Sequence, residues 1–200
     1  MRRKGALLCG APLSFLAAGI SCRRRKAETT ATTATEKLMI ETDHRYLRYA
    51  FMVAERARDH GDRPFGAVLV SSRGRILMEA ENAKHANHDC TSHAETRLLA
   101  QASRQFPRHL LSLCTLYVNA EPCPMCAGAI FWSGVGRVVF GISNARLRQL
   151  VDQPSEQLFE HCAEVLAKGT HPVEVVGPLF EEEAAQAFCQ GLVLPEAMTV

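Results

Sequence analysis

The chain has 200 residues, of which 47% are hydrophobic and 22% are charged. This composition suits one globular domain with a substantial core and leaves little room for a second domain. The net charge is only +2, so no strong basic field favours nucleic acid as the partner, although composition alone does not exclude a local groove for a polyanion.

The N-terminal segment has a pattern of its own. A basic start, an apolar stretch over 5–22 and a second basic run give the layout of a secretory leader in residues 1–26. The apolar stretch is short and contains Gly10, Pro12 and Gly19, which disfavours a membrane-spanning helix. The alternative is that the protein starts at Met39. We therefore divide the chain into an N-terminal extension, 1–38, and a domain, 39–200, for which no membrane contact is expected.

The rest of the chain alternates between helical and extended patterns of apolar residues. In chain order we expect a helix from Thr42 to Gly61, strands over 65–70 and 75–80, a loop over 82–91, a helix from Ser92 to Gln105, a strand over 114–118, a helix over 123–132, a strand over 138–140, a helix over 156–167, a strand over 173–176 and a helix over 181–190. The first two strands should form a hairpin, and Ser92 is the expected N-cap of its helix. This alternation predicts a three-layer α/β/α sandwich around a mixed sheet.

Two short segments carry the chemistry, 92–96 and 121–127. The first contains His93, and the second contains Cys123 and Cys126 three residues apart at the start of a predicted helix. A histidine nitrogen and two thiolates suit Zn²⁺, and the positive end of a helix dipole favours the thiolate form. Three protein ligands leave the fourth position of a tetrahedral zinc to water, which is the arrangement of a catalytic site.

Glu95 lies two residues after His93. On a helix it would point about 200° away around the axis, so it is poorly placed to bind the same metal. Its carboxylate can instead reach the water on the metal or the substrate beyond it. Glu95 is therefore the expected general acid and base.

The spacing H-x-E followed by P-C-x-x-C resembles the zinc-deaminase signature of the cytidine-deaminase-like superfamily, in particular its purine deaminases. The resemblance runs from about Asp43 to Gly141 and includes the segments 64–68 and 115–118. It implies that Zn²⁺ binds the two cysteines and the histidine, and that Glu95 shuttles protons. It further implies substrate contacts by the amide of Asn82, by the backbone N–H of Ala94 and by Trp132, the last across the interface of a homodimer.

The sequence departs from the family pattern beside the histidine. Cys90 stands where the family commonly has proline, and Ser92 stands where it has alanine. Loss of the proline removes a fixed backbone φ from the loop, which bears on substrate fit. The residues of the predicted zinc site are intact.

The expected function is hydrolytic deamination of a nucleobase or nucleoside, such as the purine guanine or guanosine, with release of ammonia. The alternative within the family is deamination of adenosine in transfer RNA. The acidic composition of the chain after Gly141, which lacks the aromatic and basic final helix of the RNA editors, disfavours that alternative. The expected partner is thus a small molecule, and nucleic acid is the less favoured partner.

Two interpretations of these motifs that involve no deaminase chemistry stay open. In one, Cys90 is a fourth ligand and the zinc site is purely structural; in the other, Cys123 and Cys126 are a redox pair. Both leave Glu95 without a role. Because most of the eight cysteines are isolated in the sequence, we expect a reducing compartment and a cytoplasmic location.

Overall fold

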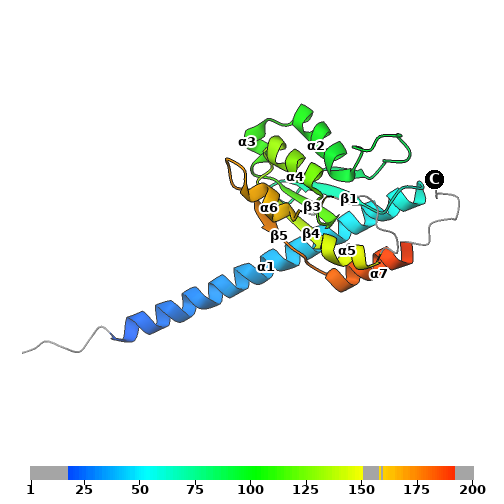
Figure 1. Cartoon of the computed structure of the whole chain (residues 1–200). Coiled ribbons are helices and arrows are strands. Elements are labelled where there is room, and N and C mark those ends of the chain that lie inside the picture. The colour runs from blue at the N-terminus through cyan, green and yellow to red at the C-terminus, as the bar shows by residue number, and fades with distance from the viewer. Residues whose placement is uncertain (1–17, 151–157, 159, 192–200) are drawn as a thin grey trace, which may run out of the picture. The chain divides into compact units, whose positions relative to one another are not determined.

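The computed structural model describes residues 18–150, 158 and 160–191 (Figure 1). The chain divides into two compact units, residues 1–40 and residues 41–200. The domain boundary after residue 38 and the alternative start at Met39 stay predictions. Most of the predicted leader, residues 1–26, lies outside the described residues.

The described elements, in chain order, are α1 (Ala18–Asp59), β1 (Gly66–Val70), β2 (Ile76–Glu81), α2 (Ala94–Gln105), α3 (Arg108–Leu111), β3 (Thr115–Ala120), α4 (Pro124–Ser133), β4 (Arg137–Ile142), α5 (Asn144–Leu150), α6 (Cys162–Ala167), β5 (Glu174–Val176) and α7 (Glu181–Gly191). The strands form one sheet in the order β2-β1-β3-β4-β5. β1 is antiparallel to both of its neighbours, whereas β3, β4 and β5 are parallel. The sheet is therefore mixed, as predicted.

Side chains of the strands alternate between two buried faces, as the twofold period of a strand requires. The part of α1 after residue 41 covers one face, where the buried strand residues are Val68, Val70, Tyr117 and Val139. Helices α2, α4 and α6 cover the other face, where the buried strand residues are Ala67, Leu69, Leu116, Val118, Val138 and Phe140 (Figure 1). This confirms the predicted α/β/α sandwich.

A buried ion pair fastens α1 to the sheet. The guanidinium of Arg137 on β4 donates to both carboxylate oxygens of Asp43, at 2.8 and 2.7 Å. The hydroxyl of Tyr117 on β3 donates to the same carboxylate at 2.8 Å. Burial raises the pKa of Tyr117, and the hydrogen bonds to Asp43 raise that of Arg137. These three hydrogen bonds fix where the helix crosses the strands.

Helix α1 begins at Ala18 rather than after Thr42. The sequence has no glycine or proline between residues 20 and 60, so nothing in it ends a helix before Gly61. The apolar period that predicted the helix begins at Tyr46, and the residues that carry it pack against the sheet. The prediction was thus right about packing and wrong about the helix start.

Three further elements differ from the predictions. The short helices α3 and α5 were not predicted, because four and seven residues are too few to show a helical period. The helix predicted over 156–167 begins at Cys162, after His161 as its N-cap; residues 151–157 and 159 lie outside the described part. The backbone N–H groups of Asn144 and Cys162, at the starts of α5 and α6, donate to one distant carboxylate, Glu121. Local sequence carries no signal of such a contact.

In the part of the chain that the structure describes, no helix has both the length and the apolar character needed to cross a membrane.

The packing of α1 on β1 leads to a stability prediction. A Cβ at Gly66 would lie 2.5 Å from both the Ala50 oxygen and the Ala54 nitrogen, which are helix backbone and cannot move aside. We expect Gly66→Ala to lower the free energy of unfolding by about 1–3 kcal/mol in urea denaturation. In the matched control, Gly128→Ala in α4, the new methyl meets nothing within 4 Å. Equal stability of the two variants would contradict this account.

Candidate metal centre

The strand directions place three connecting segments at one edge of the sheet. Because β1 is antiparallel to both β2 and β3, the strands β2 and β3 run in the same direction, as does β4. The chain therefore leaves β2 at Asn82, β3 at Glu121 and β4 at Ser143 along the same edge. In sheets of this kind, ligands bind beyond the carboxyl ends of the strands.

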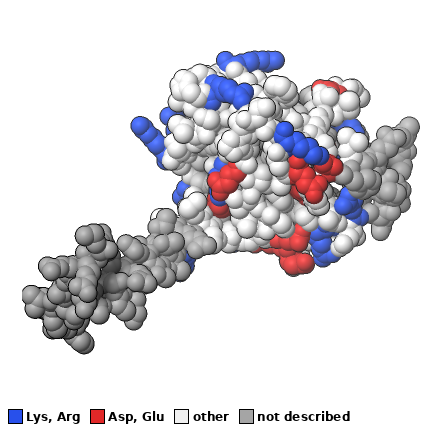
Figure 2. All heavy atoms as spheres, turned by 60° about the vertical axis from the view of Figure 1, so that its left-hand side comes forward, with Lys and Arg blue, Asp and Glu red and all other residues white. Residues whose placement is uncertain are grey.

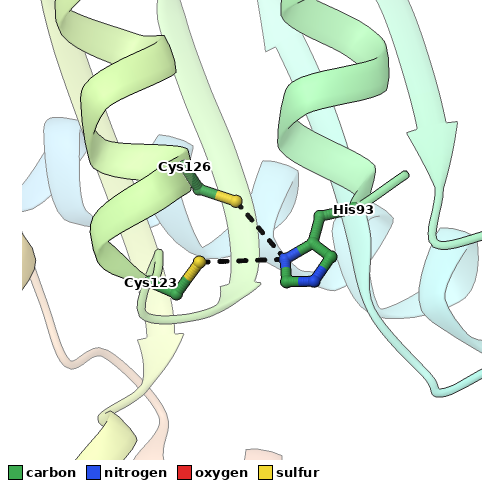
Figure 3. Close-up of side chains that lie close together, drawn as sticks. All are labelled: His93, Cys123 and Cys126. Atoms are coloured by element: carbon green, nitrogen blue, oxygen red, sulfur yellow. Dashed lines mark hydrogen bonds between the residues drawn. The ribbon is translucent and has the colours of Figure 1, made fainter. Parts of the chain in front are cut away.

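Helix α4 begins directly after β3 and presents both cysteines. Cys123 is the N-cap residue, Pro124 occupies the first turn, and Cys126 lies in the same turn. Proline is favoured there because its missing N–H is not needed and its φ suits a helix. Figure 3 shows both sulfur atoms directed to the same side, toward His93.

His93 comes from the start of α2 and faces the two sulfur atoms. It is itself the N-cap of α2, in extended conformation, so the prediction of Ser92 as the N-cap was wrong. The Ser92 hydroxyl is already used in the preceding loop, where it donates to Asp89 and accepts from Asn87. The ends of α2 and α4 therefore meet with one imidazole opposite two thiols (Figure 3).

The spacing of the three side chains fits zinc. Nδ1 of His93 lies 3.8 Å from Sγ of Cys123 and 3.5 Å from Sγ of Cys126. All three candidate ligand atoms lie within 4.8 Å of one another, and theirs is the one such group found among the described residues. Zinc bonds to sulfur at 2.3 Å and to nitrogen at 2.0–2.1 Å in a tetrahedron would separate these atoms by about 3.5 Å. The cluster matches this without rearrangement of the backbone.

Hydrogen bonds within the cluster set its protonation. The bond with the Cys126 thiol lowers the pKa of Cys123 to about 4, with support from His93 and against the effect of burial. The same bond, together with burial, raises the pKa of Cys126. The hydrogen bond with Cys123 raises the pKa of His93. Zinc binding must therefore displace the proton of the Cys126 thiol, as it does from thiol ligands generally.

Glu95 lies beside the cluster without being a member of it. The side chain is buried, with 8% of its surface exposed, and it lies close enough to the Cys126 thiol for the two groups to affect each other's pKa. Burial raises the pKa of Glu95. A carboxyl that neighbours a metal cluster and takes up a proton readily has the properties of a general acid and base.

Neither of the nearby cysteines outside the motif joins the cluster. Cys90 is exposed and is not part of the group of three. Cys162 is fully buried, and burial raises the pKa of its thiol to about 12, so it stays protonated. The described geometry thus offers three ligands rather than four, and this disfavours the purely structural zinc site.

Hydrogen bonds replace the missing proline in the loop before His93. The carboxylate of Asp89 accepts from the Thr91 N–H at 2.8 Å, from the Thr91 hydroxyl at 2.7 Å and from the Ser92 hydroxyl at 2.9 Å. The Asn87 amide then donates to the Ser92 hydroxyl at 3.1 Å. The two departures from the family pattern are therefore coupled. Cys90 does not fix the backbone as a proline would, and the hydroxyl of Ser92 stabilises the same turn by its bond to Asp89.

The predicted substrate residues differ in where they lie. Asn82 is 4% exposed, and its neighbour Ala83 donates its N–H to the Ser92 oxygen at 3.0 Å, which closes the loop and brings position 82 near His93. Ala94 is the first residue of α2, so its N–H has no partner within the helix. Trp132 is 77% exposed and follows Cys123 by about 13 Å along α4. The structure does not bring Trp132 to the cluster of its own chain.

Two acidic residues that support the site had no predicted role. Glu121 is buried and accepts from Asn144 N at 2.9 Å, from Cys162 N at 3.0 Å and from the His161 ring at 3.2 Å. It stands inside the second motif, so its position directly before the zinc ligands could have pointed to it. Asp62 is 2% exposed and contacts the loop after β2. No motif marks Asp62, and only the fold reveals it.

A zinc-content measurement distinguishes the three-ligand site from a four-ligand site. We expect Cys126→Ala to lose zinc, because a member of the cluster is removed. We expect Cys90→Ala to keep about one zinc per chain. Zinc would be measured by atomic emission after gel filtration of each purified variant. Loss of zinc from Cys90→Ala would show that the metal is closed to water and that the site is structural.

Comparison with known proteins agrees with this geometry. A family model described as the cytidine and deoxycytidylate deaminase zinc-binding region matches residues 40–142, which is just over half of the chain. The chain is 43% identical over 146 residues to a probable cytosine deaminase of Schizosaccharomyces pombe, covering 72% of this chain and 88% of the relative. It is 35% identical over 150 residues to a tRNA-specific adenosine deaminase of Haemophilus influenzae, covering 75% and 83%.

The fold comparison points the same way. A guanine deaminase from Nitrosomonas europaea superposes with a TM-score of 0.61 at 22% identity, covering 72% of this chain and 81% of that one. These findings confirm the predicted family and the predicted zinc cofactor. The chain therefore belongs to the cytidine and deoxycytidylate deaminase family: it is a zinc-type deaminase, a hydrolase acting on C–N bonds of nucleobases or nucleosides.

Proposed function

We propose that the protein deaminates a small free nucleobase or nucleoside, with guanine or guanosine as the first substrates to test. The observation that carries the proposal is the buried carboxyl of Glu95 beside the cluster of His93, Cys123 and Cys126. A purely structural metal site does not need a buried carboxyl that transfers protons beside its ligands. In this proposal the three clustered residues bind zinc and Glu95 moves the protons.

The reaction consumes one water and releases one ammonia, because a C–O bond forms at the carbon whose C–N bond breaks. Zinc on the three ligands would supply an activated water as the nucleophile. Glu95 takes up one proton of the attacking water and passes it to the adjacent ring nitrogen. It then takes the remaining hydroxyl proton and delivers it to the amine, which leaves as ammonia while the C=O bond forms. The raised pKa of Glu95 allows its carboxyl to hold a proton between these steps.

The substrate is held by groups from the two loops at the sheet edge. The Asn82 amide would bond the edge of the base, and the Ala94 N–H would bond a group near the attacked carbon. Both residues are nearly fully buried in the described structure, with 4% and 1% of their surfaces exposed. A base seated there would be largely removed from water, which strengthens each hydrogen bond that it makes.

Charge supports a small substrate over transfer RNA. The Glu181 carboxylate accepts from Ser143 N at 3.2 Å and from the Ser143 hydroxyl, so the acidic start of α7 lies at the same sheet edge as the zinc ligands. An RNA backbone at that edge would meet Glu181, Glu182 and Glu183. On the face drawn in Figure 2, acidic and basic side chains of the described residues are interspersed.

Two other substrates compete with guanine. Cytosine is supported by the relative at 43% identity, which is a probable cytosine deaminase. Adenosine in transfer RNA is supported by the relative at 35% identity. We keep guanine first because the motifs resemble those of purine deaminases, and the experiment below includes all three.

The proposal includes a homodimer in which Trp132 contributes to the partner's pocket. A tryptophan with 77% of its surface exposed is typical of an interface. Its backbone oxygen accepts from Arg108 at 3.0 Å, and Leu110 and Leu113, which follow Arg108 in the sequence, are also exposed. Sedimentation of the purified protein at the mass of a single chain would contradict the dimer.

The proposal also includes a cytoplasmic location. The six described cysteines are free thiols, and four of them lie within the motifs or the core. Thiol ligands stay available for zinc only where disulfides do not form. Recovery of the protein in a secreted fraction would contradict this location.

The test is ammonia release by the purified, zinc-loaded chain. The substrates would be guanine, guanosine, adenine, adenosine, cytosine, cytidine and a transfer RNA anticodon hairpin. We expect turnover of one small substrate, and we expect Glu95→Gln to lower kcat by about 10²–10⁴-fold because the proton shuttle is lost.

The matched control is Glu164→Gln on the exposed side of α6, which should leave kcat and zinc content unchanged. Turnover of the hairpin alone would replace the small-molecule substrate with RNA. Full activity of zinc-loaded Glu95→Gln would remove Glu95 from the mechanism.

A further inference from the structure

Asp62 connects the end of α1 to the loop that carries Asn82. Its Oδ1 accepts from Nδ2 of Asn82 at 3.1 Å and from the His85 N–H at 2.9 Å. Its Oδ2 accepts from the Ala86 N–H at 3.1 Å. Both oxygens are thus acceptors, and the three donors are one side-chain amide and two backbone N–H groups.

This carboxylate is 2% exposed, and none of the ion pairs among the described residues includes it. A buried carboxylate without a cation is unfavourable unless several N–H groups solvate it. Two backbone N–H groups would suffice to anchor the loop. The third donor is the side chain of Asn82, the residue proposed to bind the base.

The contact fixes which way the Asn82 amide faces. The two ends of an asparagine amide are nearly equal in size but opposite in hydrogen-bonding character. A 180° flip would place Oδ1 of Asn82 against Oδ1 of Asp62, so two acceptors would meet in a buried place. Asp62 therefore keeps Nδ2 on its own side. The Asn82 oxygen and the second Nδ2 hydrogen are left for other partners.

The position of Asn82 is fixed as well as its orientation. Its backbone N–H donates to the Phe65 oxygen at 2.9 Å, and the next residue, Ala83, bonds across the loop to Ser92, the residue before His93. The amide is thus held between the end of β2 and the zinc cluster. It cannot turn or shift without breaking bonds to both sides.

We infer that Asp62 is a positioning residue for the deamination, because it holds Nδ2 of Asn82 on its own side and so fixes the orientation of the amide. The enzyme would then recognise a base by one pattern of hydrogen-bond donor and acceptor along the bound edge. This inference rests on the proposed function. It narrows the substrate class to bases whose edge matches that polarity. Bases with donor and acceptor exchanged would leave buried groups unpaired and would be rejected.

A double-mutant cycle tests the inference with three variants: Asp62→Asn, Asn82→Ala and the combination. Replacement of one carboxylate oxygen by NH₂ places a donor against a donor, whichever way the new amide lies. We expect each single variant to lower kcat/KM by about tenfold to a hundredfold on the best substrate of the panel. We expect the combination to be no worse than Asn82→Ala by more than about threefold, because Asp62 acts through a side chain that is then absent.

The matched control is Asp59→Asn, the same substitution at an exposed position at the end of α1, three residues before Asp62. It should keep the activity of the parent. Zinc content and Tm are measured for all variants, and the active variants should each hold about one zinc per chain.

The outcomes separate the inference from the function on which it rests. If the fold-losses in kcat/KM of the two single variants multiply in the combined variant, Asp62 acts independently of Asn82 and only stabilises the loop. Loss of zinc from Asp62→Asn would show that Asp62 supports the metal site instead of Asn82. Unchanged activity of Asn82→Ala would show that Asn82 does not bind the base, so Asp62 would have nothing to position. Either result overturns the inference. An inactive parent chain on every substrate would instead overturn the proposed function.

Discussion

The meeting of two helix starts at the carboxyl edge of the sheet is the constraint on which the site depends. Each start leaves backbone N–H groups without partners in the helix and carries a partial positive charge. Placing α2 and α4 together there concentrates this charge where two thiols and an imidazole converge. The arrangement favours thiolate ligands, and it requires that the loops leading into both helices be held firmly.

Carboxylates of the described residues hold the loop before α2 and the segments that lie beside the start of α4. Asp62 and Asp89 bind N–H and hydroxyl groups of the loop before α2. Glu121 binds the starts of α5 and α6, and Glu181 binds the turn before α5. Each acts over a long sequence distance or within a tight turn, and each satisfies N–H groups that a strand or helix has left unpaired. Rigidity of the site therefore comes from side chains outside the cluster of His93, Cys123 and Cys126.

The sequence was sufficient to predict an element or a site residue where local periodicity or the spacing of candidate ligands carries the information. The strands β1, β3 and β4 bury apolar residues, and the cysteines three residues apart lie on one side of a helix start. It was insufficient where the deciding contact is distant. The N-cap of α2 is His93 because Asp89 and Asn87 already engage Ser92, and α6 starts late because Glu121 accepts its first N–H. The role of Asp62 has no local signal, since its three partners lie 20 to 24 residues away.

The loop before α2 shows how the chain keeps its geometry with different residues. A proline would limit the loop by removing freedom from the unfolded chain, without needing any partner. Here Asp89, Ser92 and Asn87 limit it through hydrogen bonds that exist only in the folded loop. Such bonds can loosen one at a time, whereas a proline ring cannot. The segment before His93 is thus held by side-chain hydrogen bonds, and the exposed Cys90 lies between two members of this network, Asp89 and Thr91.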